Sequence, residues 1–250
     1  MERLPIKINN IKIFDDNDFS IIAGPCAIED EESLVATAEL LVKHNVKMLR
    51  GGAYKLRTSP QSFQGYGDEA VKLLSNVAKS YNLLSVSEIP SVKEIDIFNQ
   101  FVDIILIGTR NMYNYPLLKE VGEMKKPVIL KRGMCATVNE WILAAEYIAQ
   151  NGNQNIILCE RGIRTFETVT RNTLDLASAV YVAHNFRYHV IVDPSHATGK
   201  RELVIPMTLA SKAAGVHGVM IEIHPKPDNA RSDPEQMLDF DNFEKLMEMM

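Results

Sequence analysis

The chain has 250 residues, of which 46% are hydrophobic and 24% are charged; this composition supplies a large core and excludes an intrinsically disordered protein. Its 27 Lys and Arg residues against 32 Asp and Glu residues give a net charge of −5, so the chain as a whole would repel nucleic acid and anionic membranes. No apolar run approaches the roughly 20 residues that cross a bilayer, and the first ten residues lack the apolar core of a secretory signal.

The cysteines form no disulfide framework. Their number is odd and their spacing irregular, which is typical of reduced thiols, at Cys26, Cys135 and Cys159. We therefore expect a cytoplasmic protein, with Cys135 and Cys159 as core or loop thiols.

In chain order, the segment Ile6–Phe14 predicts a small β-hairpin, and short aliphatic runs then alternate with longer amphipathic segments. The short runs predict eight strands, at Ser20–Ala23, Lys47–Leu49, Leu83–Val86, Ile104–Ile107, Val128–Leu130, Asn155–Leu158, Val190–Val192 and Val219–Ile223. The longer segments predict helices, at Glu32–His44, Asp68–Tyr81, Tyr115–Glu123, Val138–Gln150, Asn172–Asn185, Leu203–Ala214 and Pro234–Met249.

Continuous apolar strands that alternate with helices indicate a parallel sheet covered on both faces. Eight such units in about 250 residues predict an α/β fold, a (β/α)8 TIM barrel whose N-terminal hairpin closes the bottom. A doubly wound open sheet is the alternative, but it would more often show fewer strands and a Gly-rich first turn. Because there is no linker or composition break, we expect one catalytic barrel domain over residues 1–250, without a regulatory domain.

The loops that follow the predicted strands are rich in cations. In a barrel of this kind these loops meet at one mouth, so the following side chains should converge: Arg50, Lys55, Arg57, Arg110, Lys131, Arg132, Arg161 and Arg164. Like charges drawn close together repel unless anions compensate them. The ligand is therefore expected to carry several negative charges, and phosphate suits the planar donors of arginine.

Four further residues after strands one, seven and eight have metal-binding side chains, namely Cys26, His196, Glu222 and Asp233. Mixed soft and hard donors leave the metal open among zinc, iron, manganese and cobalt. Spacing alone also allows a buried thiol, a loop-ordering histidine and a carboxylate paired with a lysine.

Seven segments resemble, in order and spacing, the 3-deoxy-D-arabino-heptulosonate 7-phosphate (DAHP) synthases, in the short branch related to the 3-deoxy-D-manno-octulosonate 8-phosphate synthases. They are "IIAGPC", "RGGAYKLRTSPQSFQGYG", "IGTRNM", "ILKRG", "CERGIRT", "DPSHATGK" and "IEIHP" with its following "SD". The resemblance implies a metal-dependent transferase that condenses phosphoenolpyruvate with erythrose 4-phosphate, the first step of the shikimate pathway and of aromatic amino acid biosynthesis.

The resemblance also implies roles for individual residues. The metal ligands would be the four residues named above. Phosphoenolpyruvate would be held by Arg50, Lys55, Arg110, Lys131 and Arg161, and the aldose phosphate by Arg57, Thr58 and Ser59. Catalytic roles are expected for Lys55, Lys131, Glu160 and His196, with Lys131 passing a proton and Glu160 or His196 orienting water. Leu56 replaces a proline that is usual in the family loop.

Two alternatives remain open. An octulosonate 8-phosphate synthase would use arabinose 5-phosphate, but its relatives typically carry an Ala-Asn-Arg-Ser-Ser type of loop where this chain has "KLRTSP". A barrel without activity could bind a phosphorylated ligand. We expect a homo-oligomer, dimer or tetramer, and, with about 20 residues ahead of the first barrel strand, no inhibition by aromatic amino acids.

Overall fold

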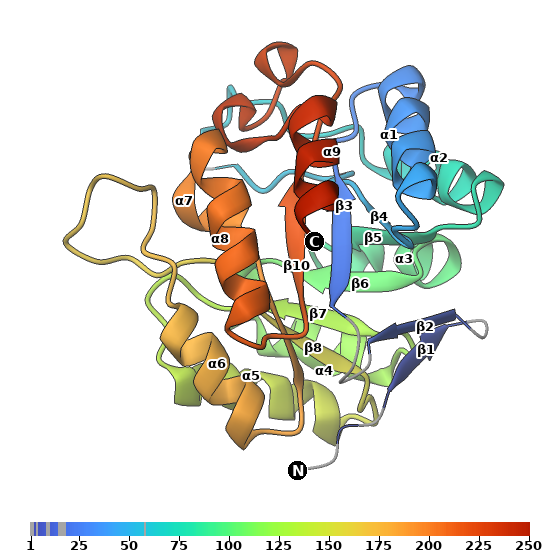
Figure 1. The fold of residues 1–250 in the computed structure, drawn as a ribbon. Helices are drawn as coiled ribbons and strands as arrows, with labels where there is room; N and C mark the ends of the chain where they lie inside the picture. Colours follow the sequence, from blue (N-terminus) through green and yellow to red (C-terminus); the bar gives the residue numbers. More distant parts are fainter. Residues whose placement is uncertain (1–2, 4, 9–10, 15–18, 58) are drawn as a thin grey trace.

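The computed structural model describes residues 3, 5–8, 11–14, 19–57 and 59–250, and within them eight parallel strands close into a barrel in the order β10, β3, β4, β5, β6, β7, β8, β9 (Figure 1). The strands are β3 (Ser20–Gly24), β4 (Met48–Arg50), β5 (Leu84–Glu88), β6 (Ile104–Ile107), β7 (Val128–Lys131), β8 (Ile156–Glu160), β9 (His189–Val192) and β10 (Gly218–Glu222). Each overlaps one of the predicted runs, so the predicted (β/α)8 barrel is confirmed.

Helices cover the outside of the barrel (Figure 1). They are α1 (Glu31–Lys43), α2 (Asp68–Ser80), α3 (Ile95–Phe101), α4 (Tyr115–Glu123), α5 (Val138–Gln150), α6 (Leu176–Asn185), α7 (Pro194–Thr198), α8 (Arg201–Ala213) and α9 (Phe240–Met249). Short 3₁₀ turns lie at η1 (Val92–Glu94), η2 (Thr109–Asn111), η3 (Pro227–Asn229) and η4 (Pro234–Gln236). None of the described helices is both long and apolar enough to span a bilayer.

The helix predictions differ from the structure chiefly at four helices. Helices α3 and α7 were not predicted, because seven and five residues are too few to show a helical period. Helix α6 begins later than predicted, since the Asp175 side chain accepts a hydrogen bond from Ser178 N and caps it there. The predicted C-terminal helix is divided into η4 and α9, and Asp239 caps the second part.

The hairpin closes the bottom of the barrel, as predicted. Its strands are β1 (Ile6–Ile8) and β2 (Ile11–Phe14), which pair antiparallel. The side chains of Ile6, Ile13 and Phe14 are buried in one cluster with inward-facing barrel residues such as Ile22 and Ile104. Burial of this apolar surface stabilises the hairpin against the amino ends of the strands and leaves the opposite mouth open.

One glycine brings two site-bearing strands together. Gly24 ends β3 with φ +151°, and a Cβ placed on it would lie 2.0 Å from the carbonyl oxygen of Arg50. Only glycine allows this approach, so β3 and β4 end side by side. As a result Cys26, two residues beyond Gly24, faces the loop that follows β4.

Candidate active site

A cavity of about 430 Å³ opens at the carboxyl ends of the strands. Six of the predicted cations line it, and they come from the ends of four different strands or the loops after them: Lys55, Arg57, Arg110, Lys131, Arg161 and Arg164. Arg171 also lines it and was not predicted. The predicted convergence of positive charge on one mouth is therefore found, although the protein as a whole is acidic.

Two cations of the predicted set do not line this cavity. Arg50 is buried behind it and forms an ion pair with Glu222. Arg132 is also buried; its Nη1 lies 2.9 Å from Glu160 Oε2 and 2.9 Å from Asp175 Oδ2, and its guanidinium stacks over Trp141. The sequence placed both residues at the ends of the correct strands, although Arg50 is the last residue of β4 and only Arg132 follows its strand. It could not show that acidic side chains lie beside them.

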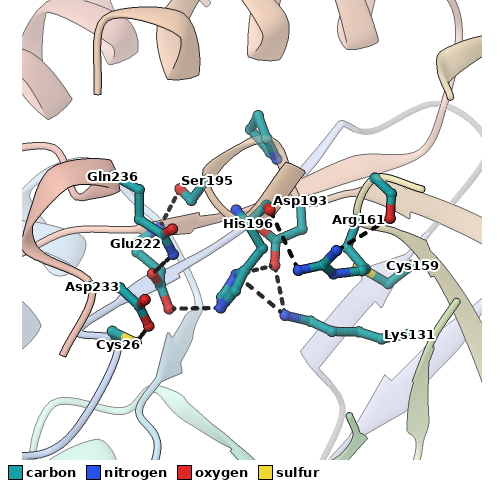
Figure 2. Close-up of polar contacts among 12 residues, drawn as sticks. Cys26, Lys131, Cys159, Arg161, Asp193, Ser195, His196, Glu222, Asp233 and Gln236 are labelled. Atoms are coloured by element: carbon teal, nitrogen blue, oxygen red, sulfur yellow. Dashed lines mark hydrogen bonds and ion pairs between the residues drawn. The ribbon is translucent and has the colours of Figure 1, made fainter. Parts of the chain in front are cut away.

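The thiol, imidazole and one carboxylate of the predicted metal site come together beside the cavity (Figure 2). The ligand atoms of Cys26, His196 and Asp233 all lie within 4.8 Å of one another, and Cys26 Sγ is 3.1 Å from Asp233 Oδ2. Glu222 lies next to this trio, with Oε1 3.4 Å from His196 Nε2, and accepts hydrogen bonds from Arg50 and Gln236.

Local backbone features place these side chains. His196 lies in α7, whose first turn is capped by Asp193 and starts with Pro194. Asp233 adopts the left-handed conformation with φ 50° just before η4, a strained position for a residue other than glycine. Glu222 is the last residue of β10, where a side chain points into the mouth.

The protonation states suit a divalent cation. Burial raises the pKa of the Cys26 thiol to about 12, with Glu222 adding to the effect, so the thiol donates to Asp233. Burial opposes ionisation of Glu222, but His196 and Arg50 lower its pKa to about 2. Burial also lowers the pKa of His196, which favours the neutral imidazole. Neutral imidazole and carboxylates are ligand forms, and an ion would replace the thiol proton. The residues fit a divalent metal.

Asp193 connects the imidazole to Lys131 (Figure 2). Its Oδ2 accepts a hydrogen bond from Lys131 Nζ at 2.6 Å and lies 2.7 Å from His196 Nδ1. Although burial opposes ionisation, the neighbouring His196 and Lys131 hold the pKa of Asp193 well below its ordinary value. The carboxylate therefore accepts from Nδ1 and leaves Nε2 of His196 free to act as a ligand. The motif "DPSH" was noticed in the sequence, but this role of its aspartate was not.

A second network supports the carboxylates from the other side. Arg171 Nη1 donates to Asp233 Oδ1 at 3.2 Å and to Gln236 Oε1 at 2.8 Å, and Gln236 in turn donates to Glu222. Neither Arg171 nor Gln236 was predicted. Arg171 belongs to the loop after β8 that begins with the quoted "CERGIRT", so its position after a strand was the available signal.

The loop after β4 carries the remaining predicted binding residues. Lys55 Nζ lies 3.0 Å from both Cys26 O and Cys26 Sγ. Arg57 Nη1 donates to Ser232 Oγ at 2.8 Å and to Asp233 Oδ2 at 3.4 Å. Ser59 lines the cavity and donates to Gln61, while Thr58 lies outside the described residues.

After β8 the two predicted residues occupy different positions. Arg161 lines the cavity, with Nη2 3.4 Å from His196 O. Glu160 is fully buried, accepts from Arg132 and from Gly162 N at 2.6 Å, and is not among the residues that line the cavity.

Comparison with known proteins identifies the family. The model of the DAHP synthetase I family matches residues 3–250. The chain belongs to this family. This match confirms the resemblance of the seven segments to the DAHP synthases. The chain is therefore an aldolase-type transferase, an enzyme of the condensation step of aromatic biosynthesis.

Two curated proteins that are similar to this chain carry related names. The phospho-2-dehydro-3-deoxyheptonate aldolase of Thermotoga maritima is 47% identical over 245 residues, which are 98% of this chain and 72% of that protein. The 2-dehydro-3-deoxyphosphooctonate aldolase of Geobacter sulfurreducens is 27% identical over 263 residues, covering 98% of this chain and 96% of that protein.

Solved structures of the family share the fold. The crystal structure of the DAHP synthase of Thermotoga maritima matches with a TM-score of 0.96 and 46% identity, covering 100% of this chain and 73% of that one. A truncated form of 3-deoxy-D-arabino-heptulosonate 7-phosphate synthase from the same organism matches with a TM-score of 0.92 and 43% identity, covering 100% of this chain and 91% of that one.

Proposed function

We propose that the chain condenses phosphoenolpyruvate with erythrose 4-phosphate to give 3-deoxy-D-arabino-heptulosonate 7-phosphate and phosphate, the first step of the shikimate pathway. The observation that carries the proposal is the cationic cavity that adjoins the Cys26, His196 and Asp233 cluster. Two phosphorylated substrates need many cations, and an aldehyde that is to be attacked by carbon needs an electrophilic group beside them.

The proposed reaction is balanced as follows. C3 of phosphoenolpyruvate forms a bond to the aldehyde carbon of erythrose 4-phosphate, whose oxygen takes up a proton. Water then adds to C2, and phosphate leaves with its oxygen. A divalent ion, Mn, Fe, Co or Zn, held by Cys26, His196 and Asp233 with Glu222 beside them, would supply Lewis-acid polarisation of the aldehyde.

Phosphoenolpyruvate is assigned to the side of the cavity lined by Lys55, Arg110, Lys131 and Arg161. Guanidinium groups bind carboxylate and phosphate through paired donors, and burial of Lys131 and Arg161 strengthens such contacts. Arg50 lies behind this wall in its pair with Glu222, so we infer that it acts through Glu222 unless that pair opens. The aldose phosphate is assigned to Arg57, Thr58 and Ser59.

Lys131 is the cavity residue best placed to move a proton, because Asp193 holds its Nζ at 2.6 Å. We assign a different role to Glu160. Its carboxylate is occupied by Arg132 and by Gly162 N, so it fixes the turn that aims Arg161 into the cavity. His196 and Lys131, which both line the cavity, then remain as the residues that orient the water attacking C2.

The second candidate is the octulosonate 8-phosphate reaction with arabinose 5-phosphate. It is favoured by the Geobacter sulfurreducens relative, of which this chain covers 96%, while the higher identity of 47% favours the heptulosonate reaction.

Phosphate release decides between the candidates. The purified chain is mixed with phosphoenolpyruvate and either erythrose 4-phosphate or arabinose 5-phosphate, before and after treatment with a chelator and after return of Mn, Fe, Co or Zn. The proposal is supported if phosphate is released with erythrose 4-phosphate and the chelator stops this release. Release with arabinose 5-phosphate instead favours the second candidate, and binding of phosphoenolpyruvate without release under any metal indicates a barrel without activity.

A further inference from the structure

The loop after β4, described over residues 51–57 and 59–67, is fixed at its base by backbone hydrogen bonds and contacted on its returning side by the segment after β10. Near the base, Lys55 N donates to Gln64 O at 2.8 Å and Gly67 N donates to Ala53 O at 3.0 Å. Arg57 and Ser59 lie between Lys55 and Gln64 in the chain, and hence in the part of the loop beyond these two bonds. Positions 57 and 59 line the cavity, so the placement of this part of the loop decides where an anion can bind.

Arg231 holds the loop from the segment after β10, a strand that only β3 separates from β4 in the barrel. Its guanidinium carbon lies 4.0 Å from the ring centroid of Phe63 and 5.7 Å from that of Tyr66, and its Nη1 donates to Tyr66 Oη at 2.7 Å. The two rings meet edge to face at 5.1 Å. The backbone N of Arg231 donates to Glu29 Oε1 at 2.7 Å. One residue therefore joins the loops after β3, β4 and β10.

We call the contacts of Arg231 with Phe63, Tyr66 and Glu29 the clamp. The position of Arg231 in the chain connects the clamp with the candidate active site. The next two residues are Ser232 and Asp233, and Arg57 donates to both of them. The β4 loop thus contacts the β10 segment twice, once inside the cavity through Arg57 and once outside it through Arg231. A metal at Asp233 and a phosphate at Arg57 would compete for the inner contact, while the outer contact stays as it is.

We propose that Arg231 is a positioning residue, which keeps the Phe63 and Tyr66 side of the β4 loop against the segment of Ser232 and Asp233 and thereby sets the affinity for the aldose phosphate. The inference rests on the proposed function, because it takes Arg57 and Ser59 as the aldose-phosphate contacts. Arg231 is suited to this role because a guanidinium can stack on one aromatic ring and at the same time donate a hydrogen bond to the hydroxyl of a second ring.

A surface arginine stacked on an aromatic ring could also serve stability alone, and the chain offers a matched control. Arg187 lies over the ring of Tyr188 at 5.2 Å and contacts Glu146, just ahead of β9 and hence at the closed end of the barrel. Its chemistry matches that of Arg231, but no cavity-lining loop is attached to it.

The test compares Arg231→Ala, Arg231→Lys and Arg187→Ala in the metal-loaded protein. For Arg231→Ala we expect the KM for erythrose 4-phosphate to rise about three- to tenfold, with the KM for phosphoenolpyruvate within about twofold, since an exposed stacked pair and one hydrogen bond are lost. Arg231→Lys should recover part of this loss, because an ammonium also binds over a ring. Arg187→Ala should leave both constants unchanged. Equal rises for both substrates, or a rise of the same size in Arg187→Ala, would overturn the proposal.

A second measurement does not depend on the reaction. Trypsin cleaves after Arg57 only when the loop opens, so the rate of that cleavage, followed by mass spectrometry, should rise several-fold in Arg231→Ala and stay at the wild-type rate in Arg187→Ala. Unchanged cleavage in Arg231→Ala refutes the clamp even if the enzyme is active. Absence of phosphate release by the wild-type protein refutes the proposed function, while the cleavage rates still test the clamp.

Discussion

Lys131 Nζ lies 2.6 Å from Asp193 Oδ2 at the floor of the cavity, and both side chains are buried. The same carboxylate lies 2.7 Å from Nδ1 of His196. One anion therefore neutralises the lysine to which we assign the proton transfer and orients the imidazole of the proposed metal site. A buried charge pair of this kind is costly to break on one side only.

Replacing Asp193 with Asn keeps the shape of the side chain and removes its charge. We expect the free energy of unfolding to fall by about 3 kcal/mol, since Lys131 then remains buried without a counter-charge. We expect kcat to fall about 100-fold, because the tautomer of His196 is no longer fixed. Urea denaturation and phosphate release measure the two effects.

A matched control for this change is Asp103→Asn. Asp103 accepts hydrogen bonds from Ser85 N and Oγ ahead of β6, remote from the mouth of the barrel. This variant should lose stability and keep kcat. A kcat for Asp193→Asn within about fivefold of the wild-type value would show that the carboxylate is not needed for the geometry of the site.

The architecture was predictable from the sequence because the apolar runs are continuous and evenly separated. That regularity also placed Cys26 and Asp233 at one mouth although 207 positions separate them, since closure of the barrel brings together the loops after all strands. The pattern could not show α7, whose five residues are shorter than two turns; its local signals were Asp193 and Pro194, an N-cap followed by proline, and Gly199 at its C-terminal end.

The side-chain partners were less predictable than the mouth itself. Arg50 is the last residue of β4 and pairs with Glu222, whereas Lys55, in the loop after β4, lines the cavity. Arg132 follows Lys131 directly and points away from it, toward Glu160. Side chains of consecutive residues, such as Lys131 and Arg132, alternate between the two faces of a strand. If the predicted end of the strand is wrong by one residue, the predicted directions of the two side chains are exchanged. Arg171 and Gln236 escaped notice because their function depends on the carboxylates they contact.

Arg57→Ala tests the assignment of the aldose phosphate. We expect the KM for erythrose 4-phosphate to rise about 10- to 100-fold, the size of a lost charge-assisted hydrogen bond to phosphate, with a smaller effect on the KM for phosphoenolpyruvate. Initial rates at varied concentrations of each substrate give both constants. Arg164→Ala, which removes another cavity cation on a different loop, is the comparison. If Arg57→Ala raises both constants equally, the loop does not distinguish the two substrates.

Cys26→Ala tests the proposed metal site without relying on turnover. We expect the affinity for Co²⁺ to fall about 100-fold, because a thiolate donor is lost while His196 and Asp233 remain. Titration of the chelator-treated protein, followed by the thiolate charge-transfer absorption and by calorimetry, measures it, and circular dichroism shows whether the fold is kept. Cys135→Ala, at an exposed thiol, should bind as the wild type does. Equal affinity of Cys26→Ala and wild type removes the thiol from the site.

The pair of Asp175 and Arg132 predicts a stability that depends on pH. Asp175 caps α6 through Ser178 N and lies 2.9 Å from Arg132 Nη1. Burial opposes its ionisation, but the bond from Ser178 and the bond from Arg132 lower its pKa below the ordinary 3.8. A carboxylate whose folded pKa is depressed stabilises the fold above its unfolded pKa, and this contribution is lost as the pH falls through the folded value.

Replacing Asp175 with Asn isolates that charge, because Asn caps a helix about as well as Asp. At pH 7 we expect the variant to be less stable by about 1 to 2 kcal/mol, the size of a hydrogen bond to a charged group. Urea denaturation from pH 7 to pH 3 should show this difference shrinking below about pH 4, where the wild-type carboxylate begins to bind a proton in the unfolded chain. Asp175→Ala should be less stable than Asp175→Asn by about 1 kcal/mol at every pH, since it also removes the cap. A difference between wild type and Asp175→Asn that stays constant down to pH 3 would mean that the ion pair with Arg132 contributes nothing to the fold.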